Sequence, residues 1–235
     1  MFKRAHHRDV ALVLQALDAQ ALSMRHCYFG GGTAMALRYG EYRESVDIDF
    51  LVSDLEGYRE LRHALQGGDG LQPIVRQGMQ LDLARDVRAD QYGIRTLVHS
   101  GESTIKFEIV FEARIALAAP SGDRICGIDT LAPIDMAAEK LLANADRWRD
   151  DAVYSRDIID LAMQHADAKL LEEACLKAEA GVYGQSVRSA LAQAVDMLQN
   201  RTGRLDQCMK ALAMTTVNQA QLWQAIRRVA RLLLA

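Results

Sequence analysis

Helical and strand patterns alternate along the first 68 residues. Residues 8–22 carry apolar side chains at helical spacing, with Val10, Leu14 and Leu17 on one side. The other elements predicted here are a short strand at 28–29, a helix over 33–39, a strand around Asp47 and a helix over 55–65 that ends at Gly67-Gly68.

The pattern changes after this region and again at Pro133. Residues 81–131 alternate in polarity between turn residues, which is typical of antiparallel strands. The predicted strands are 81–83, 93–99, 103–112 and 124–128, and the predicted helices after Pro133 are 134–145, 156–165, 169–180, 186–198, 205–214 and 221–234. We therefore expect an α+β domain over residues 1–132, followed by an all-helical C-terminal domain over residues 133–235.

The composition is that of an ordinary globular protein of 235 residues, with 50% hydrophobic and 25% charged residues. A net charge of −3 argues against a surface built entirely for nucleic acid, but it leaves room for a local basic groove. The sequence shows neither a signal-peptide pattern nor an apolar run long enough to cross a membrane, so we expect a cytoplasmic protein.

The cysteines and histidines suggest no metal centre. The four cysteines lie far apart without zinc-type spacing, and we expect reduced thiols in the core. The six histidines form no ligand constellation, and we expect His6 and His7 to lie near a loose terminus.

Two aspartates in the predicted strand around Asp47 carry the clearest chemical signal. Asp47 and Asp49 lie two residues apart and should project from the same face, while Val46, Ile48 and Phe50 face the opposite side. Carboxylates held that close repel each other unless a cation lies between them. The pair is therefore predicted to bind a hard divalent ion, Mg2+ or Mn2+, together with substrate phosphates.

A glycine-rich turn precedes the aspartate pair by a short stretch of chain. Gly30-Gly31-Gly32-Thr33 leads directly into the helix predicted over 33–39. Backbone amides at a helix N-terminus attract phosphate, so this turn is a predicted phosphate cradle. A phosphate cradle beside a metal pair indicates nucleotide chemistry.

A third acid candidate lies in the predicted strand over 103–112. Alternation places Phe107 in the core, so Lys106 and Glu108 share the other face. If this strand lies beside the Asp47 strand, Glu108 completes a cluster of three carboxylates, with Glu112 as the alternative. The competing interpretation is a Lys–Glu pair on a solvated sheet face.

Two segments together resemble a known family. The first comprises Gly31-Gly32-Thr33-Ala34, Gly40, Arg43, Ser45, Asp47, Ile48 and Asp49, and the second comprises Ala138-Glu139-Lys140-Leu141-Leu142-Ala143, Arg147 and Arg156-Asp157-Ile158-Ile159-Asp160-Leu161. Both are similar to motifs of the AbiEii/AbiGii-type toxins, which belong to the polymerase-beta-like nucleotidyltransferase superfamily. The resemblance implies a minimal nucleotidyltransferase sheet flanked by helices, with a helical C-terminal domain.

The resemblance also implies an activity and partners. We expect a Mg2+-dependent enzyme, the toxin of a toxin–antitoxin pair, that transfers a nucleotide from a nucleoside triphosphate to a tRNA-like RNA acceptor and releases pyrophosphate. A protein hydroxyl or a small molecule is the alternative acceptor, and a scaffold that binds nucleotide or a partner without turnover is the alternative function.

Particular residues acquire roles through the same resemblance. Gly32 and Thr33 match the positions that hold the triphosphate, and we expect Gly31 to grip the phosphates with them. Asp47 and Asp49 match the metal pair. Lys140 matches a lysine near the phosphates, Asp157 matches an acid at the domain junction, and Glu108 stands where an aspartate is common. Without the resemblance, Lys140 is a solvated helix residue paired with an acid, and Asp157 is a first-turn acid that favours the helix dipole.

Two further features stay open at this stage. Arg43 either neutralises a phosphate or pairs with Asp47. The last predicted helix carries Arg227, Arg228 and Arg231 near Trp223, which is typical of an RNA groove but more often marks a solvated basic face.

Overall fold

The computed structural model describes residues 2–234, which divide into two compact units. The first unit comprises Met1–Arg38 and Ser45–Ala132, and the second comprises Tyr39–Glu44 and Pro133–Ala235. The segment Tyr39–Glu44 therefore groups with the C-terminal unit, although sequence analysis includes it in the N-terminal domain.

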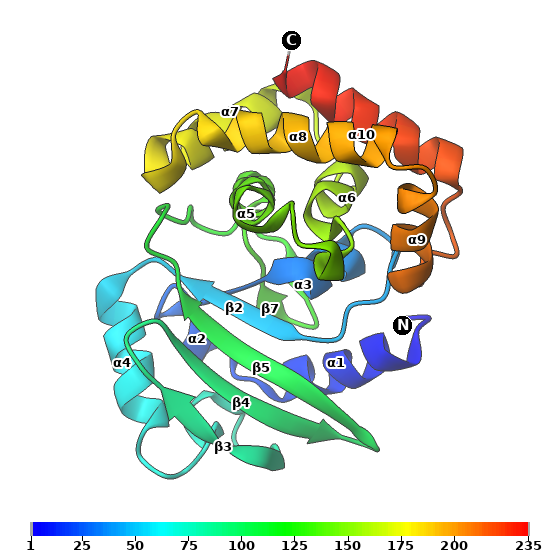
Figure 1. The fold of residues 1–235 in the computed structure, drawn as a ribbon. Coiled ribbons are helices and arrows are strands. Elements are labelled where there is room, and N and C mark those ends of the chain that lie inside the picture. The colour runs from blue at the N-terminus through cyan, green and yellow to red at the C-terminus, as the bar shows by residue number, and fades with distance from the viewer. Residues whose placement is uncertain (1, 235) are drawn as a thin grey trace. The chain divides into compact units, whose positions relative to one another are not determined.

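A five-stranded mixed sheet forms the centre of the first unit (Figure 1). Its strands are β1 (Tyr28–Gly30), β2 (Ile48–Val52), β3 (Leu83–Ala89), β4 (Gly93–Ser100) and β5 (Ser103–Phe111). The spatial order is β1-β2-β5-β4-β3, and only β2 and β5 run parallel to each other. A separate two-stranded sheet consists of β6 (Arg124–Ile125) and β7 (Ile128–Asp129).

One face of the sheet is apolar and buried. Phe29, Phe50 and Phe107 stack across β1, β2 and β5, with neighbouring ring centroids 5.6 Å apart, and all three are fully buried. Ile48 and Ile109 lie on the same face and are equally inaccessible. The alternate positions of β2 and β5 therefore point away from this core.

Helices pack around the sheet of the first unit. They are α1 (Ala5–Ala16), α2 (Ala19–Ser23), α3 (Gly31–Arg38), α4 (Leu55–Leu65) and the 3-10 turn η1 (Gln72–Ile74). Helix α1 packs on β4 and β5, and α3 packs on β1 and β2. Asp54 caps α4 by accepting a hydrogen bond from the Gly57 amide at 2.6 Å, which explains why the helix begins at Leu55.

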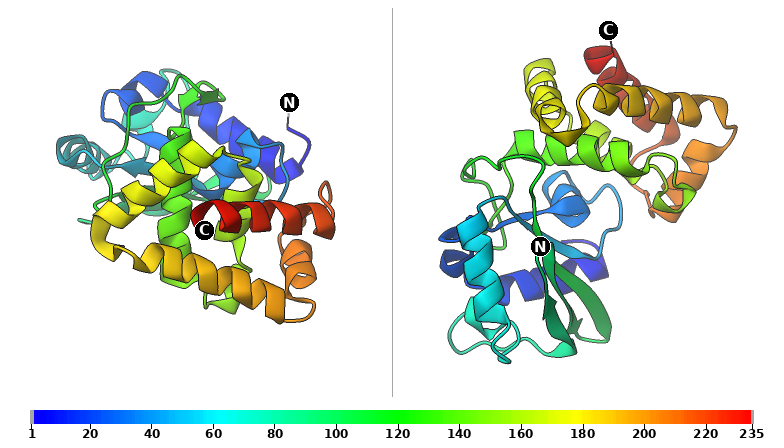
Figure 2. Two further views of the ribbon diagram at one scale, coloured as in Figure 1. Left: turned by 90° about the horizontal axis from the view of Figure 1, so that it is seen from above. Right: turned by 60° about the vertical axis from the view of Figure 1, so that its left-hand side comes forward.

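The second unit is helical. Its elements are α5 (Pro133–Arg147), η2 (Asp151–Val153), α6 (Arg156–Met163), α7 (Ala168–Ala178), the π-helical turn η3 (Glu179–Tyr183), α8 (Ser186–Asn200), α9 (Arg204–Ala211) and α10 (Gln219–Leu233). Helix α10, coloured red, packs on α6 and α7 (Figure 2). It buries Leu222, Ile226 and Val229, and Asn218 with Gln221 forms a capping box at its start.

The α+β class, the antiparallel β3–β4–β5 arrangement and the helical C-terminal unit confirm the expectations from sequence. The single helix predicted over 8–22 is wrong, because the chain leaves helical geometry at Leu17, where it bridges to Val75, and Asp18 then caps α2. The expected loose terminus at His7 is also wrong, because His7 is fully buried in α1.

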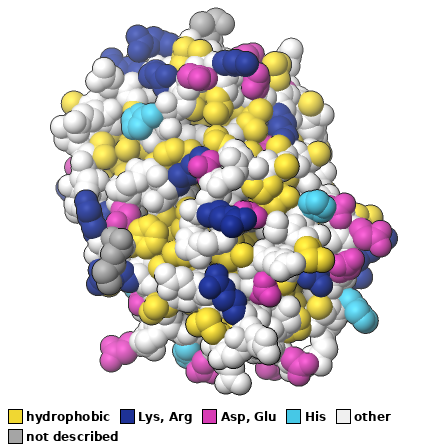
Figure 3. Space-filling view, turned by 180° about the vertical axis from the view of Figure 1, so that it is seen from behind, with side chains coloured by type: hydrophobic (Ala, Val, Ile, Leu, Met, Phe, Trp, Pro, Cys, Tyr) yellow, Lys and Arg dark blue, Asp and Glu magenta, His cyan; other side chains and the backbone are white. Residues whose placement is uncertain are grey.

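Charges are interspersed on the surface that Figure 3 shows, where Lys and Arg side chains alternate with Asp and Glu among exposed apolar atoms. All four cysteines are free thiols. Cys27, Cys175 and Cys208 are buried as expected, whereas Cys126 is only half-buried and does not belong to the core. None of the helices in the described part of the chain is long and apolar enough to span a membrane.

Candidate functional site

The glycine-rich turn lies directly against Asp49. Gly30 ends β1 and pairs with Asp49 of β2, and α3 begins at Gly31. Gly31 has φ +68°, and a Cβ at this position would lie 2.8 Å from the Cβ of Asp49 and closer still to its carboxylate. Glycine is therefore required twice, by the backbone conformation and by the approach of the carboxylate.

Thr33, two residues after Gly31, is held in place by a hydrogen bond within the first unit. Its side chain is fully buried, and its hydroxyl donates to the Ser45 Oγ at 2.9 Å. The Ser45 amide in turn donates to the Nε2 of His7 at 3.3 Å. His7, which sequence analysis set aside, thus helps to hold the segment that leads into Asp47.

The two aspartates occupy the beginning of β2. Asp49 lies within the strand, whereas Asp47 lies one residue before it, and both are half-buried. Asp49 pairs in register with Glu108 of the parallel strand β5, and Glu108 pairs in register with Arg95 of β4. The predicted adjacency of the Asp47 strand and the Glu108 strand is confirmed.

Glu108 is engaged by two cations. It accepts a hydrogen bond from the Arg95 Nε at 2.5 Å and forms an ion pair with Lys106. Burial raises the pKa of Glu108, but the hydrogen bonds from Lys106 and Arg95 outweigh this effect and hold the pKa below its usual value. The Lys–Glu pair that was the competing interpretation of this strand is therefore present.

The donor set at this end of β2 fits a hard cation with substrate oxygens as further ligands. Asp47 and Asp49 supply the carboxylates. Burial lowers the pKa of the neighbouring Lys106, but the hydrogen bond and charge of Glu108, followed by the charges of Asp49 and Asp47, raise it above its usual value. Among residues 2–234, no group of three or more His, Cys, Asp or Glu side chains is arranged to hold a metal. Glu112, the alternative third acid, is buried and bonded to Arg114.

A buried ionic cluster in the second unit gathers the remaining predicted residues. Asp160 of α6 accepts hydrogen bonds from the Tyr42 hydroxyl at 2.7 Å and from the Arg43 Nε and Nη2 at 2.6 and 2.8 Å. The Lys140 Nζ lies 2.7 Å from the same carboxylate. Arg43 therefore pairs with Asp160, and the expected alternative pairing with Asp47 is wrong.

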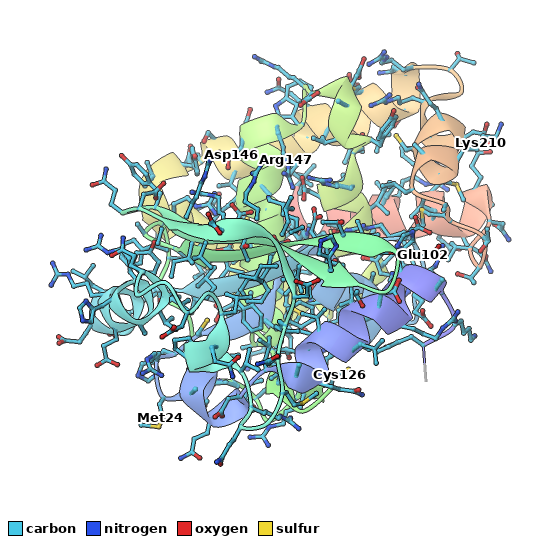
Figure 4. All side chains as sticks on the ribbon, turned by 90° about the horizontal axis from the view of Figure 1, so that it is seen from below. Met24, Glu102, Cys126, Asp146, Arg147 and Lys210 are labelled. Atoms are coloured by element: carbon cyan, nitrogen blue, oxygen red, sulfur yellow. The ribbon has the colours of Figure 1, made fainter. Side chains whose placement is uncertain are left out.

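Asp157 is the second carboxylate of the cluster. It lies 3.3 Å from the Lys140 Nζ and accepts two hydrogen bonds from Arg147 at 2.7 and 2.9 Å. Arg147 lies in the last turn of α5, next to Asp146 (Figure 4). Lys140 is buried, so the interpretation of a solvated helix lysine is wrong, whereas Asp157 does lie in the first turn of α6.

Three cations (Arg43, Lys140 and Arg147) surround two carboxylates (Asp157 and Asp160), and the charge of Asp146 also acts on Arg147. Burial raises the pKa of Asp160, but Arg43 and Lys140 lower it by more, so the pKa lies well below its usual value. Asp160 stays ionised although it is completely buried.

Sequence reasoning missed the roles of Tyr42 and Asp160. A usable signal was present, because Asp157 and Asp160 are three residues apart and therefore share one face of a helix. No local pattern indicates that residues 39–44 reach that face.

Two solved structures resemble this fold. One is a presumed nucleotidyltransferase from H. pylori, with 18% identity, coverage of 99% of this chain and 97% of the other, and a TM-score of 0.56. The second is JHP933 from Helicobacter pylori, with 18% identity, coverage of 99% and 95%, and a TM-score of 0.55. These similarities define the fold as that of the nucleotidyltransferases.

The sequence profile of the AbiEii nucleotidyl transferase toxins of type IV toxin–antitoxin systems matches residues 13–229. The chain therefore belongs to the AbiEii toxin family, as the motifs indicate. The family implies a transferase and an antitoxin partner. None of the curated proteins matches the chain.

Replacement of Gly31 by Ala should perturb Asp49 as well as the backbone. The positive φ alone costs about 1–2 kcal/mol for a residue with a Cβ. Gly40→Ala is the matched control, because Gly40 has φ +91° and nothing within 4 Å of the added Cβ. Thermal unfolding should show a larger loss for Gly31→Ala than for Gly40→Ala, and equal losses would contradict the close approach to Asp49.

Asp160→Asn should destabilise the protein at neutral pH by about 3–5 kcal/mol, because Arg43 would keep a buried charge without its partner. The folded-state pKa of Asp160 is depressed, so its stabilising contribution is present above the unfolded pKa of about 3.9 and is lost as the pH falls toward the folded pKa. Urea unfolding between pH 7 and pH 2.5 should therefore show the gap between wild type and variant narrowing below about pH 4. A gap independent of pH would contradict this assignment.

Proposed function

We propose that this protein is a Mg2+-dependent nucleotidyltransferase that transfers a nucleoside monophosphate from a nucleoside triphosphate to an RNA acceptor. The close approach of the Gly31 turn to Asp49, in a chain of the AbiEii family, carries the proposal. It brings a phosphate-binding turn and a carboxylate pair to one point of a rigid sheet. Nucleoside triphosphates and RNA occur together in the cytoplasm, which we propose as the site of action.

The turn binds the nucleotide. The amides of Gly31 and Gly32 at the start of α3 face the triphosphate in this proposal, and Thr33, whose buried hydroxyl donates to Ser45, holds the turn in place. Asp47 and Asp49 hold the divalent ion. Bound Mg2+ or Mn2+ supplies polarisation of the α-phosphate and neutralisation of the leaving pyrophosphate.

The chemical step is a displacement at the α-phosphorus. The acceptor hydroxyl oxygen forms a bond to phosphorus, the bond to the bridging oxygen of the β-phosphate breaks, and pyrophosphate leaves. We assign Glu108 as the third carboxylate, which completes the ligand set or takes the hydroxyl proton.

The ionic cluster of the second unit provides the lysine that we propose to stabilise the negative charge of the substrate phosphates. Lys140 stabilises charge on the transferred or leaving phosphates, and Asp157 orients the Lys140 ammonium group. Arg43 pairs with Asp160, the other carboxylate that contacts Lys140, and so helps to hold the Lys140 ammonium group in place.

The Asp47→Ala/Asp49→Ala variant should lose nucleotide transfer completely. It should stay folded, because removal of two mutually repelling carboxylates costs little stability. Purified protein is incubated with Mg2+, labelled nucleoside triphosphates and total cellular RNA, beside separate pools of protein and small molecules. Label on a tRNA-sized band from wild type only supports the proposal, whereas label confined to protein or small molecules replaces the RNA acceptor by one of these.

Glu108→Gln separates a role in proton transfer from a role in structure. The amide keeps the shape but cannot accept the proton, so kcat should fall by about 10²–10⁴-fold while the Tm changes little. The pH profile of kcat should also lose its acidic limb. A variant with wild-type kcat, or one that merely unfolds earlier, would contradict the assigned role.

A further inference from the structure

One face of the sheet in the first unit carries a line of cations. We call Arg85 and Arg88 of β3, Arg95 of β4 and Lys106 of β5 the basic strip. Arg95 pairs in register with both Glu108 and Arg88, and Leu97 pairs with both Lys106 and Arg85. The register of β3 shifts between Arg85 and Arg88, so that both arginines, although three residues apart, lie opposite outward-facing residues of β4. Register partners project from the same side of a sheet, and all four cations therefore lie on the face opposite the buried core.

The basic strip begins at the predicted catalytic carboxylates. Asp49, Glu108, Arg95 and Arg88 form one row across β2, β5, β4 and β3. Adjacent strands lie about 4.8 Å apart, so the row extends about 14 Å from Asp49. These residues all belong to the first unit, and strand pairing fixes their positions relative to one another.

The outer half of the strip has unpaired charges. Arg95 is bound by Glu108 and Asp90, and Lys106 is bound by Glu108. Arg85 and Arg88 are exposed, and within residues 2–234 neither side chain makes an ion pair or a hydrogen bond. The acids Asp49, Glu108 and Asp90 lie around Lys106 and Arg95, so the positive charge that stays available to a ligand is that of Arg85 and Arg88.

An exposed aromatic residue lies in the turn that joins β3 and β4, close in the chain to Arg88 and Arg95 of the basic strip. Tyr92, in the turn between β3 and β4, is 65% exposed, and its backbone is fixed by a hydrogen bond from its amide to Asp90 at 2.7 Å. Cations without partners bind phosphates, and an exposed ring offers a stacking surface to an unpaired base. A flat charged sheet face with one aromatic residue suits a single-stranded nucleic acid better than an acidic protein helix, which requires an apolar groove.

We propose that the basic strip and Tyr92 bind the backbone and a base of the RNA acceptor and lead its reactive end to Asp47 and Asp49. This inference rests on the proposed function and extends it to the surface that selects the substrate. Arg85 and Arg88 contact phosphates, while Arg95 and Lys106 link the strip to the catalytic row.

The test is direct binding of a tRNA-sized RNA, measured by fluorescence anisotropy without nucleoside triphosphate. Arg85→Ala/Arg88→Ala should weaken binding by about tenfold or more near 0.1 M salt, because two phosphate contacts are lost. The slope of log K against log salt should fall by about 1.4–1.8 in magnitude, as expected for two contacts. Tyr92→Ala should weaken binding of single-stranded RNA without changing that slope.

The matched control removes two positive charges elsewhere. Lys169 and Lys210 are exposed residues of the second unit, and each forms only a solvated i,i+4 ion pair (Lys210 is labelled in Figure 4). Lys169→Ala/Lys210→Ala should bind RNA as the wild type does. Wild-type affinity and slope in Arg85→Ala/Arg88→Ala would overturn the proposal, as would an equal loss in the control or equal displacement of RNA by an acidic polypeptide.

Binding is measured without turnover, so the two proposals fail separately. If Arg85→Ala/Arg88→Ala loses RNA affinity while the wild type transfers no label to any acceptor, the basic strip stands and the proposed activity fails. If the wild type labels RNA and the double variant binds that RNA normally, the activity stands and the basic strip is overturned.

Discussion

The position of β2 between β1 and β5 is the constraint on which the candidate site depends. Its pairing with β1 brings Gly30 opposite Asp49, and its parallel pairing with β5 brings Glu108 to the other side. The apolar side chains of the same strand, Ile48 and Phe50, are anchored in the core. The alternate positions of the strand, which include Asp49, therefore project from a backbone that is firmly packed on its other face.

The Gly31 turn lies very close to the Asp49 side chain. A backbone with positive φ lies against a carboxylate, with no room for a Cβ between them. Helix N-terminal amides attract phosphate and carboxylates attract cations, so the ligand that we propose for this pair of features is a metal–nucleotide complex.

The buried cluster around Asp160 shows how charged side chains are accommodated in the core of the helical unit. Buried charges lower stability unless every one has a well-placed partner, and Asp160 receives Tyr42, Arg43 and Lys140 at hydrogen-bonding distance. The chain passes from this cluster into Ser45, whose hydroxyl receives Thr33. A short segment thus connects the ionic core of the helical unit, along the chain, with the strand that carries the aspartates.

The local sequence determined most of the helices, the antiparallel strands, the glycine turn and the aspartate pair, because each depends on periodicity or on neighbours within a few residues. The break at Leu17 is an exception, because there the chain bridges to the distant Val75. Other features depend on residues far apart in the chain. They are the burial of His7, the ion pair between Arg43 and Asp160, and the contact of Glu108 with Arg95 in addition to Lys106. Asp49 and Glu108, for example, become neighbours only through the parallel pairing of β2 and β5, which no pattern within either strand specifies. Sequence could name the chemical groups of the site, but tertiary structure decided which of them meet, because strand order and the packing of residues 39–44 are set by burial of the whole core.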